Sequence, residues 1–482
     1  MEKSLGQNKG EQLQEAGAKS PSLQDFDWIV LEFLDYNNIL RAREVRPNYY
    51  SRIFSKGLNF SKAIMDFTIF EDMVANPRWG AETGDFFAKP AQETFARLDY
   101  LPRTARVFCD LVDEQGRPWE GCPRNLLKRV VSKFEDEDEE LRISISVAFE
   151  AESYLLRKVS SEKEKEGVHN ASYLPADDSK CFSPDGLEIE HPILSEVMRC
   201  LESAGVYVEK VTAEYGPGQY EVNFSQSSPL KSADNFVLYR EIWRGVARKH
   251  GLLATFMPKP FENSAGSGLH IHLSAERISE HQSKGGGIRR NRKKALEDDA
   301  FFKSKDTLSE LGLSFVAGLL KHARAISAFC NPTVNSYRRL QLGTWAPALI
   351  TYGGGNRNSL IRIPDNSTRI EFRSPDSTCN PHLALGAILA AGYDGIKRGL
   401  EAPSLIFEDP SRLSEKELRE RKLEFLPRNL GEAIYALKKD IVLKKLLGET
   451  LCEEFVKLRE AEWNRFLKQV TPWEIETYIE TY

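Results

Sequence analysis

Several stretches of the chain alternate between hydrophobic and polar residues, and a period of two predicts β-strands. The strongest alternation runs over residues 143–156. One face of this predicted strand carries large aliphatic and aromatic residues, whereas the other carries small residues followed by Glu150 and Glu152. Two carboxylates on one face repel each other unless water or a cation screens them. The pattern therefore leaves two interpretations open, a solvated edge face and a metal site.

A second alternating stretch, residues 269–274, follows the small residues 264–268, which include Gly266. Glycine lets the backbone turn tightly and approach a ligand closely, because it has no Cβ atom. Leucine and isoleucine occupy one face of the predicted strand, and His270, His272 and Ser274 occupy the other. Two imidazoles after such a turn suit a metal ion and a phosphate. A core strand with two hydrogen-bonded histidines is an equally good interpretation of this segment taken alone.

The same patterns predict the other elements. Strands are expected at residues 27–35, 104–113, 206–211, 219–224, 356–364 and 369–373, and helices at 123–131, 191–204, 233–250, 308–329 and 381–400, with a mainly helical segment at 414–482. Residues 160–186 are polar and contain prolines, which predicts a surface loop. The acidic run 135–140 predicts a solvated turn. Residues 25–120 are expected to form a small, strand-rich first domain.

Composition narrows the class of protein. The chain has 482 residues, of which 41% are hydrophobic and 28% charged, and its net charge is −5. These values are typical of a soluble globular protein and give no basic field for nucleic acid. No apolar run reaches the ~20 residues that span a bilayer. Seven scattered cysteines without a C-x-x-C pair indicate reduced thiols and a cytoplasmic location.

Two segments look peripheral to the fold. Residues 1–24 are polar and lack the apolar core of a secretory signal, so we expect a disordered tail. Residues 276–299 contain three consecutive glycines and a cluster of arginines and lysines, which predicts a flexible basic insertion. Docking of an acidic partner to this insertion is a less favoured alternative.

Acidic, histidine and arginine residues recur on the polar faces and in the adjoining loops. They are Glu150, Glu152, Glu214, Glu221, His270, His272, Arg357, Arg362, Arg369, Glu371 and Arg373. Oxygen and imidazole ligands without thiolates suit Mg²⁺ or Mn²⁺. Arginines close by suit carboxylate or phosphate groups. The combination predicts metal-assisted phosphoryl transfer from a nucleotide, on a scaffold without a Walker loop.

Motifs in these regions resemble, in their order, those of the glutamine synthetase family, in its class I-like branch. The motifs are Glu150-Ala-Glu152, the segment 214–221 (EYGPGQYE), Lys259-Pro260, the segment 266–272 (GSGLHIH), the segment 331–340 (NPTVNSYRRL), the segment 369–373 (RIEFR), Pro375-Asp376 and Asn380-Pro381. The resemblance extends from about residue 25 to the C-terminus.

The resemblance implies an α+β fold with an N-terminal β-grasp domain at residues 25–120. A catalytic domain at residues 121–482 would contain a curved antiparallel sheet flanked by helices. Members of the family form rings with active sites between subunits, which implies a large ring-shaped homo-oligomer. The substrates implied are ATP, glutamate and ammonia or an amine. ATP would phosphorylate the glutamate side chain, and the nitrogen nucleophile would then displace phosphate.

Residue roles follow from the same resemblance. Two to three Mg²⁺ or Mn²⁺ ions are implied, one held by Glu152, Glu214 and Glu221 and a second by Glu150, His270 and Glu371. Gly266, Arg339 and Arg373 would bind glutamate. Arg357, Arg362 and His272 would stabilise the transferring phosphoryl group. Ser274, Arg357 and Arg369 would contact ATP.

The chain departs from the family at the nitrogen site. Glutamine synthetases carry a flap glutamate that helps to bind and deprotonate ammonium, and here Trp345 stands at that position. The first domain also lacks the expected aspartate, and Ala265 replaces a usual asparagine near glutamate. An indole offers apolar area and a π face in place of a carboxylate. The change is selective, because all six metal-ligand positions are retained.

These departures favour a γ-glutamyl–amine ligase that acts on an organic amine, with Trp345 as part of the acceptor site. An ordinary glutamine synthetase with a different ammonium site is the first alternative. A catalytically silent structural relative is the second, and the retained ligands argue against it. The related guanidino kinases share the catalytic scaffold but not these motifs. The identity of the amine, the ring size and any regulation cannot be deduced from the sequence.

Overall fold

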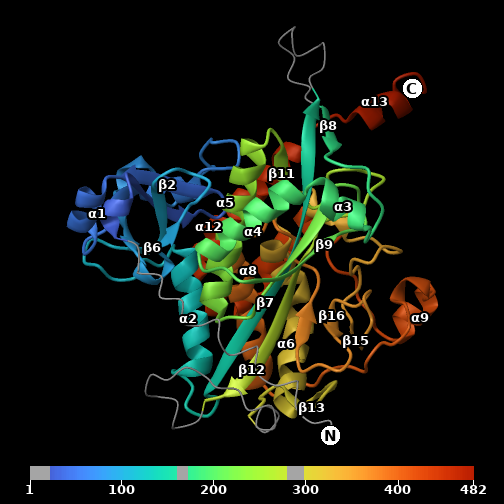
Figure 1. The fold of residues 1–482 in the computed structure, drawn as a ribbon. Coiled ribbons are helices and arrows are strands. Elements are labelled where there is room, and N and C mark those ends of the chain that lie inside the picture. The colour runs from blue at the N-terminus through green and yellow to red at the C-terminus, as the bar shows by residue number, and fades with distance from the viewer. Residues whose placement is uncertain (1–21, 160–171, 279–297) are drawn as a thin grey trace, which may run out of the picture.

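The computed structural model describes residues 22–159, 172–278 and 298–482 and contains two main β-sheets (Figure 1). The expected tail at residues 1–24 lies outside the described residues except for its last three. There Ser22 caps a 3₁₀ turn at Leu23–Asp25. Most of the insertion predicted at residues 276–299 also lies outside them.

The first sheet is built from the N-terminal part of the chain. Its strands follow the order β2-β1-β6-β4-β3, with β5 paired to β6, and β1 runs parallel to β6. Their bounds are β1 Trp28–Leu34, β2 Leu40–Val45, β3 Leu58–Ser61, β4 Asp85–Pro90, β5 Ala96–Arg97 and β6 Thr104–Val112, with helix α1 at Pro47–Ile53. Edge-to-face contacts of Phe33 with Phe60 and Phe86 fill its core.

The second sheet has nine strands and carries the polar residues singled out in the sequence. Its order is β15-β16-β17-β12-β7-β10-β9, and β8 and β11 also pair with β7. The bounds are β7 Ile143–Val159, β8 Ser172–Pro175, β9 Val208–Ala213, β10 Gln219–Phe224, β11 Leu253–Thr255, β12 Leu269–Arg277, β15 Tyr352–Gly354, β16 Ile361–Ile363 and β17 Ile370–Phe372. Adjacent strands are antiparallel except for β15 and β16. A separate hairpin joins β13 Phe302–Ser304 to β14 Thr307–Leu308.

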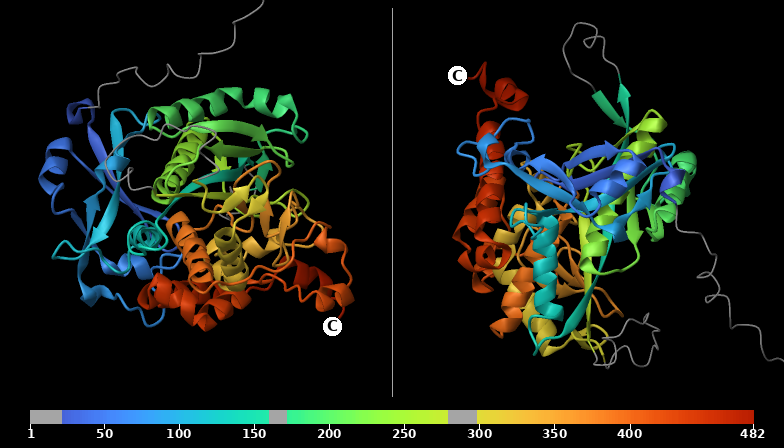
Figure 2. Two further views of the ribbon diagram at one scale, coloured as in Figure 1. Left: turned by 90° about the horizontal axis from the view of Figure 1, so that it is seen from below. Right: turned by 90° about the vertical axis from the view of Figure 1, so that its left-hand side faces the viewer.

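Helices pack behind this sheet and beside it (Figure 2). Their bounds are α2 Pro123–Glu135, α3 Pro184–Ile189, α4 His191–Ser203, α5 Pro229–Lys249, α6 Glu310–Cys330, α7 Ser336–Arg339, α8 Pro381–Lys397, α9 Glu415–Glu420, α10 Leu430–Lys439, α11 Ile441–Leu447, α12 Glu449–Phe466 and α13 Pro472–Tyr478. Among the described helices, α6 alone is long and apolar enough to cross a membrane. It packs on α8 and α10, and 78% of its apolar stretch is buried inside the protein, as in a core helix.

The element predictions were mostly confirmed, with three corrections. The predicted loop at 160–186 contains β8 and α3 in its described part. The strand predicted at 206–211 lies two residues later, as β9. The strand predicted at 356–364 shrinks to β16, because Asn356 turns the backbone by accepting a hydrogen bond from the Asn358 amide.

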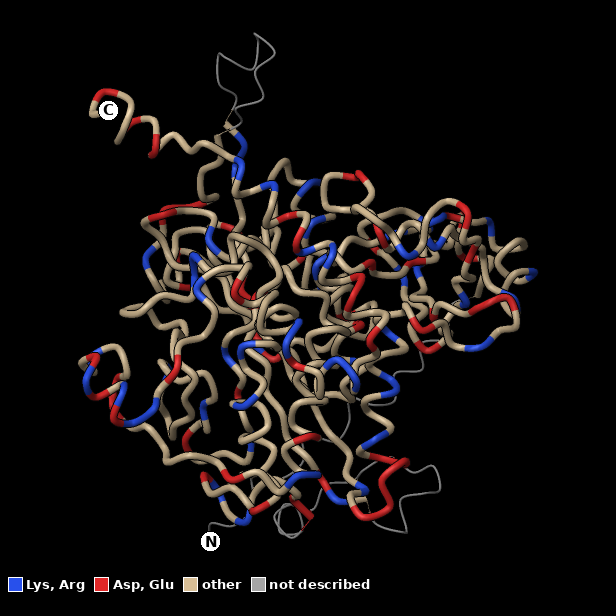
Figure 3. Tube along the Cα trace, turned by 180° about the vertical axis from the view of Figure 1, so that it is seen from behind, with Lys and Arg blue, Asp and Glu red and all other residues tan. Residues whose placement is uncertain are grey.

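One buried ion-pair network joins the first sheet to helix α5. Arg106 on β6 is fully buried, pairs with Glu32 on β1, and lies 3.2 Å from Glu241 on α5. Lysine and arginine positions are otherwise interspersed with acidic ones along the chain, as seen from behind (Figure 3). The strand register and this seam together fix where the polar face of the second sheet opens.

Candidate active site

A cavity of about 580 Å³ opens on the polar face of the nine-stranded sheet, where β7, β10 and β12 lie side by side. Its lining includes most of the residues predicted to form the site: Glu150, Glu152, Glu214, Glu221, Gly266, His270, Arg339, Trp345, Arg357 and Arg373. These residues come from segments as far apart in the sequence as Glu150 and Arg373, and the fold brings them to one place.

Strand register explains the placement of the acidic and histidine side chains. His270 on β12 pairs with Glu150 on β7, and Glu221 on β10 pairs with Glu152. Glu371 on β17 pairs with His272. Directly paired residues of antiparallel strands point to the same face. The alternation read from the sequence therefore becomes a compact patch of ligand atoms.

Three carboxylates crowd one end of this patch. Burial raises the pKa of Glu214 to about 7, with the charge of Glu152 adding to the effect. Burial, followed by repulsion from Glu150, Glu152 and Glu214, raises the pKa of Glu221 to about 8. Glu152 is held in position by the Gly268 amide, which donates to Oε2 at 2.7 Å. Acidic groups forced together in this way suit a divalent cation, which would neutralise them.

The two histidines have different hydrogen-bonding states. His270 Nδ1 is buried, makes no hydrogen bond, and lies 3.5 Å from Glu150 Oε2 and 3.7 Å from Glu371 Oε1. Burial, with a further contribution from Arg373, lowers the pKa of His270, which favours the neutral ring. A neutral imidazole nitrogen facing two carboxylates fits a metal ligand. Glu150, Glu221 and His270 also lie close enough together to share one ion.

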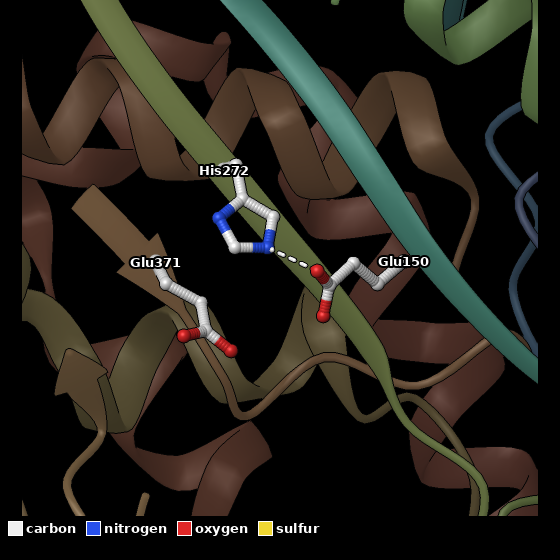
Figure 4. Close-up of side chains that lie close together, drawn as sticks. All are labelled: Glu150, His272 and Glu371. Atoms are coloured by element: carbon white, nitrogen blue, oxygen red, sulfur yellow. Dashed lines mark ion pairs between the residues drawn. The ribbon is translucent and has the colours of Figure 1, made fainter. Parts of the chain in front are cut away.

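His272 differs from His270 in its neighbours and in its hydrogen bonding (Figure 4). Glu150, His272 and Glu371 form a second group with metal-binding spacing, and His272 Nε2 lies 3.0 Å from Glu150 Oε1. Arg369 Nε, however, donates a hydrogen bond to His272 Nδ1 at 3.1 Å. A neutral ring that accepts at Nδ1 carries its proton at Nε2, which leaves no lone pair there for a metal. This contact distinguishes His272 from His270, whose Nδ1 makes no hydrogen bond.

Glu371 is fully buried beneath these groups. Arg362 Nη1 donates to its Oε2 at 2.9 Å, and Arg373 Nη1 donates to its Oε1. Burial raises its pKa, but Arg373 and both histidines outweigh that effect, and the pKa falls to about 2. The pKa of Glu150 is also lowered, because the two histidines outweigh burial. Both carboxylates are thus ionised at neutral pH.

A smaller cavity of about 270 Å³ lies on the other side of Glu150. Ser274, Arg369 and His272, all predicted to act on ATP or its phosphoryl group, line it. Asn223, whose Oδ1 is buried without a partner, lines it as well. Glu150 borders both cavities, so the ligand patch separates two compartments.

Arg339 and Gly266 form a tightly packed wall of the larger cavity. The Arg339 guanidinium donates to the carbonyl oxygens of Arg373, Ser374 and Pro375 at 2.8–3.2 Å. A Cβ atom added at Gly266 would lie 2.8 Å from Arg339 Cγ and 2.9 Å from the Pro258 carbonyl oxygen. The close approach explains the requirement for glycine at this position.

Exposed aromatic residues surround the cavity mouth. Trp345 is 66% exposed, and Arg373 Nη2 donates to its carbonyl oxygen at 3.4 Å, which ties the flap to the site. Tyr215 and Phe182, also well exposed, line the same cavity. Sequence reasoning missed Phe182, because it lies in a stretch predicted to be a plain loop. Tyr215 appeared in the sequence analysis only as part of the motif at residues 214–221.

Comparison with known proteins adds to this geometry. The model of the glutamine synthetase catalytic domain matches residues 120–478. A glutamine synthetase from Methanocaldococcus jannaschii is 37% identical over 83% of this chain and 84% of its own length. A glutamate–methylamine ligase from Methyloversatilis universalis is 33% identical over 94% and 96%.

A solved structure, titled a GmaS/ADP complex, superimposes with a TM-score of 0.79 at 30% identity and covers 95% of this chain and 97% of its own. The matched lengths include both sheets. The α+β architecture and the family expected from the motifs are thereby confirmed. The chain belongs to the glutamine synthetase family of ATP-dependent carbon–nitrogen ligases.

Proposed function

We propose that the protein joins the γ-carboxyl group of glutamate to an organic amine, at the expense of ATP, through γ-glutamyl phosphate. The reaction would take place in the cytoplasm and would use two to three Mg²⁺ or Mn²⁺ ions. The enzyme would be a large ring-shaped homo-oligomer, in which each chain contains domains 25–120 and 121–482. Authentic glutamine synthetase activity, with ammonium as the acceptor, is the second candidate. It is supported by relatives that bear that name.

The chain's own groups account for the first step, in which a glutamate carboxylate oxygen attacks the γ-phosphorus of ATP and ADP leaves. Bound divalent ions supply charge neutralisation on the phosphoryl oxygens. Arg362 Nε is buried without a partner beside the ligand patch, and Arg357 lies exposed on the cavity wall. These two guanidinium groups would contact the transferring phosphoryl group, and His272 Nε2 would offer a further proton donor.

In the second step the amine nitrogen attacks the γ-carbonyl carbon, the bond to phosphate breaks, and the nitrogen loses a proton. The flap around Trp345, which lines the cavity, would limit hydrolysis of the acyl phosphate by water. Arg339 and Arg373 hold the wall on which glutamate would lie.

The choice of an organic acceptor depends mainly on one observation. Trp345, the residue at the position of the ammonium-binding glutamate, presents an exposed indole at the mouth of the cavity. An indole has no carboxylate to deprotonate ammonium, whereas its face and apolar area attract an alkylammonium group and its carbon chain.

The test is release of ADP and phosphate with ATP, Mg²⁺ and glutamate, without acceptor, with ammonium, and with a panel of small amines and polyamines. Preference for an organic amine would support the proposal. Preference for ammonium would assign ordinary glutamine synthetase activity and contradict the role of Trp345. Absence of turnover with every acceptor, in folded and assembled protein, would contradict both activities and favour a catalytically silent relative or a different acid substrate.

A further inference from the structure

A cavity of about 620 Å³ lies apart from the active site, at the seam between the first sheet and the second. The turn after β1, helix α5, residues 255–258 and helix α12 contribute to its walls. None of the residues assigned above to metal, glutamate or ATP lines it. We call it the seam cavity.

Arg240 of α5 reaches into the seam cavity without a counter-charge. Only 7% of the residue is exposed, and its Nε and Nη1 atoms are buried without hydrogen-bond partners. Its Nη2 makes one long contact, 3.4 Å from the Asn38 carbonyl oxygen. The guanidinium carbon lies 5.6 Å from the centre of the Phe256 ring, which offers no charge. A buried, unpaired guanidinium is costly unless a ligand completes its hydrogen bonds.

Two more arginines extend the positive surface along the same helix face. Arg244 and Arg248 follow Arg240 at intervals of four residues, line the cavity, and have no carboxylate within 4.0 Å among the described residues. Burial, together with the neighbouring charge of Arg244, lowers the pKa of Arg240 to about 9. Three unneutralised cations in one row repel each other.

The acidic residues of the seam cavity do not neutralise this row, because they are already paired. Glu241 pairs with Arg106, and Glu462 lies 3.1 Å from Arg459. The remaining walls offer polar and apolar contacts. Ser377 has a buried Oγ atom without a partner, and Met257 and Pro258 provide an apolar edge. The cavity therefore combines excess positive charge, a free hydroxyl and room for a small molecule.

We propose that the seam cavity binds a small organic or inorganic anion with at least two negative charges, carried by carboxylate or phosphate groups, which Arg240 and Arg244 would contact. Planar guanidinium groups match both kinds of oxyanion through paired N–H donors. Neutralising the row would relieve both the burial cost of Arg240 and the repulsion along α5.

The seam cavity is linked to the active site by a short segment. Met257 and Pro258 line the seam cavity, whereas the next residue, Lys259, lines the catalytic one. Asn335, which also lines the seam cavity, accepts from the Lys259 amide at 2.8 Å and donates to the Lys259 carbonyl oxygen at 3.1 Å. An anion in the seam cavity would thus contact a segment that continues into the catalytic wall.

The test is calorimetric titration of the full-length, EDTA-treated protein with citrate and, separately, with pyrophosphate. Each titration is repeated on Arg357→Gln, which removes a cation from the lining of the active site, so that binding there is recognised by its loss. We expect saturable binding that this change does not abolish. Tighter binding of citrate would assign a carboxylate ligand, and tighter binding of pyrophosphate a phosphate ligand. Acetate at equal ionic strength should not bind.

Variants locate the binding. Arg240→Gln and Arg244→Gln should each weaken it at least about tenfold, whereas Arg199→Gln, which removes an exposed arginine of α4, should leave it unchanged. Arg244 is exposed, so its variant tests the site even where Arg240→Gln affects folding. Ligand-free Arg240→Gln is expected to melt at a higher temperature than the parent protein. The proposal is overturned if neither anion saturates, if Arg357→Gln abolishes the binding of both, or if Arg199→Gln weakens binding as much as Arg244→Gln.

Discussion

Glu371 shows how much of the site depends on one side chain. It is fully buried, and its two oxygens separate the guanidinium groups of Arg362 and Arg373. Without it those cations would face each other, and His270 would lose one of its two carboxylate neighbours. The residue is thus both a candidate metal ligand and the counter-ion of Arg362 and Arg373.

We predict that Glu371→Ala lowers ATP turnover at least a hundredfold while the oligomer still assembles. ADP release measures the first effect and size-exclusion chromatography the second. Glu420→Ala, which removes an exposed glutamate of α9, serves as the matched control and should behave as the parent protein. A Glu371→Ala enzyme that retains turnover would contradict the metal assignment.

Glu214 and Glu221 predict an unusual dependence of stability on pH. Their pKa values are raised to about 7 and about 8 in the folded protein, against about 4.3 in an unfolded chain. Between about pH 4.3 and about pH 8 the folded state binds more protons than the unfolded state. The free energy of unfolding that this pair contributes therefore falls as pH rises. The contribution is complete below the unfolded pKa and is lost progressively up to about pH 8.

In EDTA, the urea midpoint should therefore fall between about pH 5 and about pH 8, and saturating Mg²⁺ should restore it at the upper end. Glu221→Gln should reduce both the pH dependence and the effect of Mg²⁺. If Mg²⁺ raised the urea midpoint equally at about pH 5 and about pH 8, the crowded carboxylates would not be the cation site.

At the scale of elements, the flap at residues 340–347 differs from the sheet that it covers. Five of the six candidate metal ligands lie on strands with paired backbones, and Glu214 lies in the turn between β9 and β10. Trp345, by contrast, is exposed, and its segment is tied to the site through Arg373. A change in the flap should therefore alter the acceptor without altering phosphoryl transfer.

We predict that Trp345→Ala lowers kcat/KM for the preferred organic amine about tenfold to a hundredfold, through loss of indole contacts. The KM values for ATP and glutamate should change little. Tyr435→Ala, which removes an exposed aromatic side chain of α10, provides the control. An equal loss for ammonium and for the amine would show that Trp345 does not select the acceptor.

The success of sequence-based prediction also varies between elements for physical reasons. Strands β7 and β12 were predicted because each buries one face against helices, which imposes a period of two. Strand β15 was missed, because its tyrosine and two glycines resemble a turn and gain strand geometry only from pairing with β16. Strand β8 was missed because its side chains remain largely exposed.

The candidate site shows a similar division. Residue types and motif order predicted which side chains gather in the two cavities. They did not predict that three carbonyl oxygens hold Arg339, or that Arg369 fixes the tautomer of His272. Those contacts depend on tertiary packing between segments far apart in the sequence.

At the scale of the whole molecule, the seam between the two sheets depends on the buried triad of Arg106, Glu32 and Glu241. Arg106 also lies 3.6 Å from the centre of the Phe108 ring. Burial raises the pKa of Glu32 well above its usual value, despite the opposing effect of Arg106.

Arg106→Leu should lower the free energy of unfolding by about 3–5 kcal/mol, because two buried carboxyl groups lose their counter-charge. Urea denaturation measures the loss, with Arg199→Gln as the surface control. The triple change Arg106→Leu, Glu32→Leu, Glu241→Leu should recover much of it. If Arg106→Leu were as stable as the parent protein, the triad would contribute little to the stability of the seam.

The separation of ligand-bearing strands from the flap has an evolutionary consequence. Substitutions in one short loop leave the hydrogen-bonded strands intact, so on the proposed function a lineage can change its nitrogen source in a few mutational steps. Changes in β7, by contrast, disturb its pairing with four other strands at once. Selection can therefore act on the choice of amine while the phosphorylating half of the enzyme stays constant.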